Sequence, residues 1–87
     1  MKIIVNKSED AKAVIKKVEN AGDRQLVLVI PRDSKFGEGV KNLEILREVA
    51  TELGKEIVIE TVDENILALA KVQGFDAHPP LFEGSAK

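Results

Sequence analysis

The stretch Leu26-Val27-Leu28-Val29-Ile30-Pro31 decides the fold of this chain. Five consecutive apolar residues without alternation are typical of a parallel strand that is covered on both faces. The proline ends the strand, because it has no N–H to donate to a neighbour. We therefore expect a central strand with both faces buried, in a sheet of mostly parallel strands.

The segment before this strand predicts one strand followed by one helix. Ile3-Ile4-Val5 is a short β-branched run, and Ser8 after it supplies an N-cap hydroxyl, with the carboxylates of Glu9 and Asp10 in the first helical turn. Gly22 stands where a left-handed residue would end the helix. Apolar residues recur between these ends at helical spacing: Ala11, Val14, Ile15, Val18 and Ala21.

The segment after the central strand repeats the alternation twice. The polar stretch 32–41 reads as a loop, and a second helix then ends at Gly54. A third strand at Ile57-Val58-Ile59 precedes a third helix over Ile66 to Val72, with Asp63 as its N-cap and Gly74 just beyond its end. The apolar positions of the second helix are Leu43, Leu46, Val49, Ala50 and Leu53.

This alternation predicts an α/β domain, because strands separated by single helices are joined by right-handed parallel crossovers. We expect a Rossmann-like βαβαβα arrangement in two or three layers, with three helices, three to four mostly parallel strands and a short fourth strand near Phe75-Asp76-Ala77. Residues 1–77 form the predicted domain. His78-Pro79-Pro80 ends regular structure, and 78–87 is predicted to be a flexible tail.

Composition limits the classes of partner. The 87 residues hold one core, and 13 basic against 15 acidic residues give a net charge of -2, which offers no general attraction to nucleic acid or anionic membranes. The chain lacks cysteine and an apolar run long enough for a signal peptide or a membrane span. We expect a cytoplasmic protein, or a module of a larger one, that binds neither nucleic acid nor membranes.

One loop carries the residue types of a ligand site. Ligands of open parallel sheets bind outside the carboxyl ends of the strands, where the loop after the central strand and the end of the third strand meet. The alternative is an ordinary crossover loop, since Gly37-Glu38-Gly39 begins a dinucleotide-like pattern that Asn42 breaks. The candidate ligand-binding residues are Arg32, Asp33, Ser34, Lys35, Gly37, Gly39, Thr61 and Asp63.

No catalytic signature stands out. His78 is the single histidine and has neither a second imidazole nor a cysteine to complete a metal set. Ser8 is explained as a cap, and Ser34 and Ser85 as loop or tail residues, so a nucleophile with its base is missing. We therefore predict that the chain binds no metal and no cofactor. The sequence favours a protein without catalytic activity over an enzyme.

The third helix is apolar nearly all round. Such a helix is either covered on two sides within its own domain or contacts another chain or domain. The candidate interface residues are Ile66, Leu67, Leu69 and Ala70.

A family resemblance covers about residues 1 to 77. It is carried by Leu26–Pro31, Asn42–Arg47, Ala50–Lys55, Thr61–Asp63 and Leu69-Ala70, which are mainly core, cap and turn positions. The pattern resembles the small Rossmann-like N-terminal module of bacterial baseplate-like and uncharacterised multidomain proteins. The resemblance implies an accessory or interaction module and transfers no catalytic residue.

Two functions follow as expectations. The first is a non-catalytic interaction or structural module, self-associating or part of a larger protein, with a protein partner or a second copy as its target. The second is a small-molecule or phosphate/nucleotide-binding domain that uses the loop after the central strand.

Overall fold

The computed structural model describes residues 1–80. Residues 81–87 of the predicted tail lie outside the described residues. Its sheet has four strands in the order β1-β2-β3-β4, and every neighbouring pair is parallel. The predicted parallel α/β fold is confirmed, including the short fourth strand. The strands are β1 (Lys2–Ile4), β2 (Gln25–Ile30), β3 (Glu56–Thr61) and β4 (Asp76–His78).

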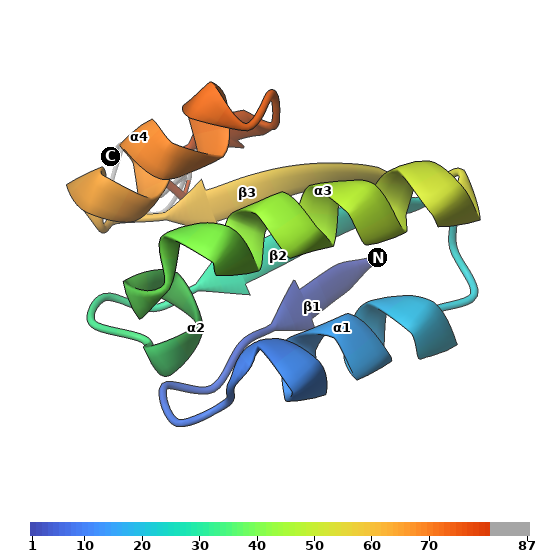
Figure 1. Cartoon of the computed structure of the whole chain (residues 1–87), viewed down its shortest axis with the longest axis horizontal. Coiled ribbons are helices and arrows are strands. Elements are labelled where there is room, and N and C mark those ends of the chain that lie inside the picture. The colour runs from blue at the N-terminus through green and yellow to red at the C-terminus, as the bar shows by residue number, and fades with distance from the viewer. Residues whose placement is uncertain (81–87) are drawn as a thin grey trace, which may run out of the picture.

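The helices all lie on one face of this sheet (Figure 1). Each strand pairs with the next one along the chain, and right-handed crossovers in one direction place every connecting helix on the same side. The fold is therefore two-layered, and the prediction that the central strand is covered on both faces is wrong for residues 1–80. The helices are α1 (Ala11–Asn20), α2 (Lys35–Glu38), α3 (Val40–Leu53) and α4 (Glu64–Val72).

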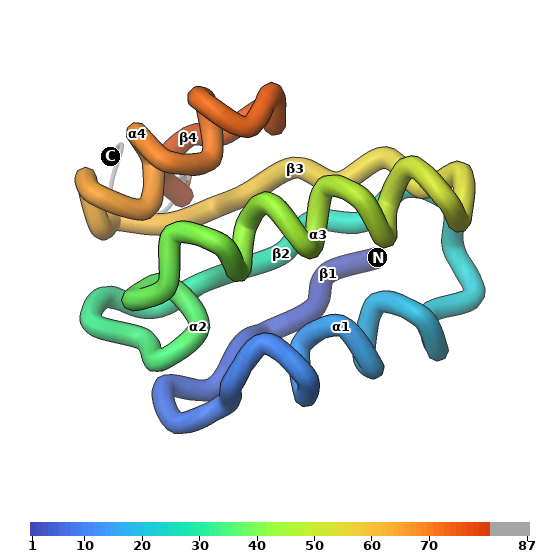
Figure 2. The backbone as a smooth tube through the Cα atoms, in the orientation of Figure 1, coloured from blue at the N-terminus to red at the C-terminus, as the bar shows by residue number. Residues whose placement is uncertain are grey.

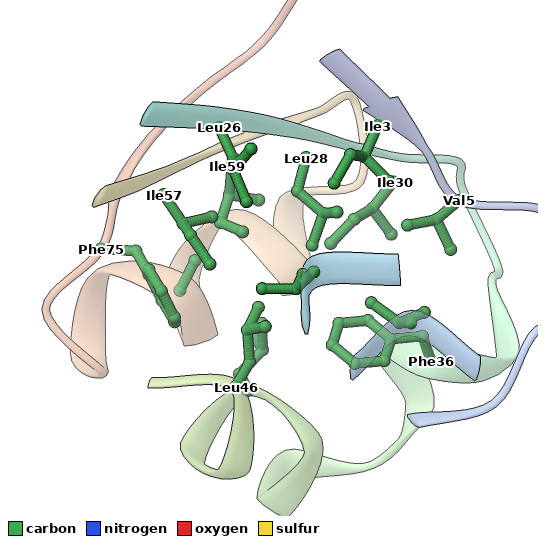
Figure 3. Close-up of a cluster of buried hydrophobic side chains, with 14 of the residues drawn as sticks. Ile3, Val5, Leu26, Leu28, Ile30, Phe36, Leu46, Ile57, Ile59 and Phe75 are labelled. Carbon is green, nitrogen blue, oxygen red and sulfur yellow. The ribbon is translucent and has the colours of Figure 1, made fainter. Parts of the chain in front are cut away.

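The core fills the space between the sheet and the helices (Figure 3). Leu26, Leu28 and Ile30 point from β2 into this space, towards Phe36 and Leu46 on the helical side. Successive side chains of a strand point to opposite faces, so the residues between them point away from the core. An apolar run that looks uniform in the sequence is thus divided between a dry face and an open one.

The ends of α1 differ from the prediction. Asp10 rather than Ser8 is its N-cap, with the Asp10 carboxylate accepting a hydrogen bond from the Ala13 N–H at 3.0 Å. At the other end Gly22 has no left-handed conformation. Instead Lys55 Nζ donates to the carbonyl oxygens of Ala21 at 2.9 Å and Asp23 at 2.8 Å. These two hydrogen bonds hold the chain just beyond the helix, while the helix end itself is closed by the Ala21 N–H, which donates to the Val18 carbonyl.

The other two predicted helix ends are confirmed. Gly54 (φ 68°) and Gly74 (φ 88°) both adopt the left-handed backbone that glycine accepts without steric cost. Asp63 caps α4 as predicted, accepting hydrogen bonds from the backbone N–H groups of Asn65 and Ile66.

The predicted loop 32–41 is a packed segment rather than an open loop. It contains the single turn α2, and α3 already begins at Val40; Figure 2 traces this path beside the ends of the strands. Phe36 is fully buried in the core, and a side chain at Gly37 would collide with Ile66. The residue types that suggested a binding loop are here largely explained by packing.

Candidate functional site

No helix of residues 1–80 covers the sheet face turned away from the helices, which is called the open face below. The strand register aligns its side chains in rows across the sheet. One row runs Lys2, Val27, Val58 and Asp76, and the next runs Ile4, Val29, Glu60 and His78, with Gln25 and Glu56 at the amino ends of β2 and β3.

An apolar band lies in the middle of the open face. It consists of Ile4, Val27, Val29 and Val58, which are side by side on three adjacent strands. The Ile4 side chain is 56% exposed, and the three valines are half-buried, whereas their core-facing neighbours Leu26 and Leu28 are buried. All-parallel sheets are normally covered on both faces, and no helix of residues 1–80 covers this β-branched strip.

The charges on the open face are unevenly placed. Lys2 stands on β1, while Glu56, Glu60 and Asp76 stand on β3 and β4. Lys2 Nζ reaches diagonally over β2 to lie 3.6 Å from Glu60 Oε1, and the Glu60 residue is only 8% exposed. The Lys2 side chain therefore starts at the β1 edge and crosses the apolar band, so that its charge lies beside the acidic residues of β3 and β4.

The second candidate site lies at the carboxyl ends of β2 and β3. Arg32 Nη2 donates to the Val62 carbonyl at 3.3 Å, and the Asp33 N–H donates to Asp63 Oδ2 at 3.3 Å. Thr61 Oγ1 accepts from the Asp63 N–H at 3.1 Å. The structure thus brings together four of the predicted ligand residues: Arg32, Asp33, Thr61 and Asp63.

The electrostatics of this edge are dominated by Asp63. Partial burial acts to raise the pKa of its carboxyl, but hydrogen bonds from the N–H groups of Asp33, Ile66 and Asn65, together with the charge of Arg32, outweigh burial and lower the pKa. The carboxylate therefore already occupies the amino end of α4, where an anionic ligand would otherwise be attracted.

The remaining predicted ligand residues do not converge on this edge. Ser34 is buried, and its Oγ accepts from the Gly37 N–H at 3.0 Å as the cap of α2. Gly39 lies against the Asn42 side chain, and Lys35 is exposed. A sheet with sequential strand order also lacks the point at which the strand order reverses, which is where open α/β sheets form their ligand crevice.

The predicted interface on α4 is split between interior and surface. Ile66 and Ala70 are buried in the core of the chain itself, while Leu67 and Leu69 are half-buried. Val72, near the end of the helix, is 78% exposed. The apolar character of α4 is thus explained in part by its packing on β3 and β4.

The open face was missed at the sequence level, although a signal for it exists. Glu56 and Glu60 flank the apolar Ile57-Val58-Ile59 at alternating positions, and Gln25 precedes Leu26 in the same phase. Polar residues at every second position indicate a strand with one wetted face. Val58 interrupts that alternation, as Val27 and Val29 do on β2, and so hides the pattern.

Comparison of this chain with protein-family models, with curated proteins and with solved structures finds no match in any of the three. Within residues 1–80, no group of three or more His, Asp or Glu side chains is placed to hold a metal ion. None of the helices in the same range is long and apolar enough to cross a membrane.

Proposed function

We propose that this chain is a non-catalytic protein-interaction module and that the open face is its binding surface. The observation that carries the proposal is the apolar band of Ile4, Val27, Val29 and Val58 on a sheet whose helices all lie on the opposite side. Sheets composed wholly of parallel strands are normally covered on both faces. A second protein surface supplies the missing layer.

The shape of the surface favours a folded partner. The band is spread over three strands and lies on one side of the sheet, so it offers a broad face rather than a groove. The edge strands β1 and β4 have three residues each, which leaves little backbone for pairing with an added strand. Side-chain packing on the face is therefore the mode of binding. The resemblance to an accessory module of multidomain proteins agrees with this function.

A photo-crosslinking amino acid placed at Val27 tests the proposal in cells that express the full chain. The matched control carries the same amino acid at Val72, which is exposed on α4 in the other layer. We expect a protein adduct from Val27, mapped by mass spectrometry to one site on its partner and abolished by Val29→Lys, and no such adduct from Val72. Absence of any adduct at Val27 in a variant with native circular dichroism would overturn the proposal.

The competing function is a small-molecule or phosphate/nucleotide-binding domain at the carboxyl edge of the sheet. Its support is the convergence of Arg32 and the Asp33 N–H at the ends of two adjacent strands. The Asp63 carboxylate at the same place opposes an anion. A thermal-shift screen with nucleotides and phosphorylated metabolites decides the matter, since a ligand that binds the native state raises the melting temperature. Lack of a shift at millimolar concentration would remove this alternative.

A further inference from the structure

We propose that the partner of the open face is a second copy of this chain, packed face to face about a two-fold axis parallel to the strands. This inference rests on the proposed function and names its partner. It follows from the first row of the open face, in which Lys2 and Asp76 stand at the two ends and Val27 and Val58 at the centre.

A two-fold axis parallel to the strands reverses the strand order of the second sheet. It places β1 of one copy over β4 of the other and β2 over β3, while each residue keeps its position along the strand direction. In the first row, Lys2 then faces Asp76 of the second copy, and Val27 faces Val58. Apolar residues meet apolar residues at the centre of this row, and opposite charges meet at its two ends. In the second row Ile4 faces His78 of the second copy, and Val29 faces Glu60.

The other symmetric arrangement is disfavoured by the same charges. An axis in the plane of the sheet but perpendicular to the strands places β1 over β1 and β4 over β4. No Lys2 then faces Asp76 of the second copy, and the two Asp76 carboxylates share one edge. Juxtaposed like charges oppose such an association and select the parallel axis.

In the proposed dimer Lys2 exchanges Glu60 of its own chain for an acidic residue of the second copy, and the Lys2–Glu60 pair is weak enough to allow this. Its N–O distance of 3.6 Å and the 63% exposure of the Lys2 side chain make it a weak pair. In the dimer the lysine of each copy leaves its own Glu60 and reaches the acidic edge of the other copy, where Glu60 and Asp76 both stand. The number of ion pairs is therefore maintained when the apolar band is covered.

The size of the face sets the expected strength of association. Two strands of six residues and two of three, about 4.8 Å apart, give a face of roughly 300 Å². Two copies therefore bury on the order of 600 Å², which is well below the standard size of a stable interface. A reversible dimer is expected, so association has to be measured up to about 1 mM protein.

Sedimentation equilibrium of the full chain measures this association. We expect the mass to rise from 9.5 kDa towards twice that value with concentration, and Val27→Lys, which places a charge against Val58 of the second copy, to weaken association at least about tenfold. Val72→Lys, which adds the same charge to α4, should leave association unchanged. A chain that stays monomeric at about 1 mM, or a Val27→Lys variant that associates as the wild type does, would overturn the proposal.

Thiol crosslinking tests the direction of the axis, because the natural chain has no cysteine. A mixture of the Lys2→Cys and Asp76→Cys proteins should give a covalent dimer with a short bis-maleimide. Lys2→Cys alone should not, because its two copies lie three strand spacings apart, about 14 Å across the sheet. Crosslinking of Lys2→Cys to itself but not to Asp76→Cys would overturn the arrangement.

The two proposals fail in different ways. A monomeric chain whose Val27 position crosslinks to another protein overturns the dimer and retains the interaction module. A chain that is monomeric and yields no adduct at Val27 overturns both.

Discussion

The two faces of the sheet are made from neighbouring residues of the same strands but belong to different environments. Leu26, Leu28 and Ile30 are buried under the helices, while Val27 and Val29 between them are half-buried on the open face. On the helical face the side chains of the sheet and the helices pack against one another, whereas the open face carries an apolar band among charged residues. An apolar residue on the helical face therefore contributes to the stability of the fold, while one on the open face stays partly in contact with solvent.

The largest expected effect comes from comparing Leu28→Ala with Val27→Ala. Leu28 is fully buried, so its truncation should lower the free energy of unfolding by about 2–5 kcal/mol through lost burial and a cavity. Val27→Ala should lower the free energy of unfolding by less than about 1 kcal/mol, because the Val27 side chain already contacts solvent. Urea denaturation at low protein concentration measures both. Equal losses would mean that the two faces are equally covered.

The next effect tests how tightly the helical layer is packed. A Cβ at Gly37 would collide with the Ile66 side chain, so Gly37→Ala should lower the free energy of unfolding by about 1–3 kcal/mol. Gly22→Ala is the matched control, because a Cβ there meets no atom within 4 Å and the backbone is not left-handed. The control should change stability by less than about 0.5 kcal/mol or raise it slightly. A neutral Gly37→Ala in thermal denaturation would contradict this packing.

The sequence was informative about local structure and uninformative about what covers the sheet. Helical periodicity identified Val14, Val18, Leu43 and Leu46 as core residues, and all four are buried. Cap chemistry is local, so Asp63 and the turns at Gly54 and Gly74 were also predictable. The sequential strand order was left open, because strand pairing depends on contacts distant in the chain.

The errors at the candidate sites have the same origin. Phe36 and Gly37 looked like loop residues, and only the approach of α4 in space reveals that they are packed. Lys55 binds the Ala21 carbonyl just after α1 from 34 residues away, a contact that no local pattern indicates. The apolar run of β2 predicted cover on both faces because Val27 and Val29 are as apolar as their buried neighbours, although no helix of residues 1–80 covers their side of the sheet.

A third prediction concerns pH and the strand ends between the two faces. The pKa of Asp63 is lower in the folded chain than in the unfolded one, so the unfolded state binds more protons near pH 4 and stability rises with pH. The contribution is complete above the unfolded pKa of about 3.9 and is lost as the pH falls through the folded pKa. Asp63→Asn keeps the cap geometry without the charge.

We therefore expect Asp63→Asn to lose about 1 kcal/mol or less at pH 7 and to show a smaller loss of stability on acidification below about pH 4. Chemical denaturation at a series of pH values checks this. If wild type and variant decline in parallel, the hydrogen bonds from Asp33, Asn65 and Ile66 do not hold the carboxylate as described.

The smallest effect compares one ion pair in each layer by double-mutant cycles. Lys17 Nζ lies 2.9 Å from Glu9 Oε1 and also donates to the Ile4 carbonyl at 3.1 Å, whereas Lys2 Nζ lies 3.6 Å from Glu60 Oε1 and is more exposed. Both couplings should be within about 1 kcal/mol, with Lys2–Glu60 the smaller and the more easily screened by salt. A coupling for Lys2–Glu60 that exceeds the other and resists salt would mean that water is excluded from the open face. Because the four helices of residues 1–80 lie on the other side of the sheet, something other than these helices would then have to cover the open face.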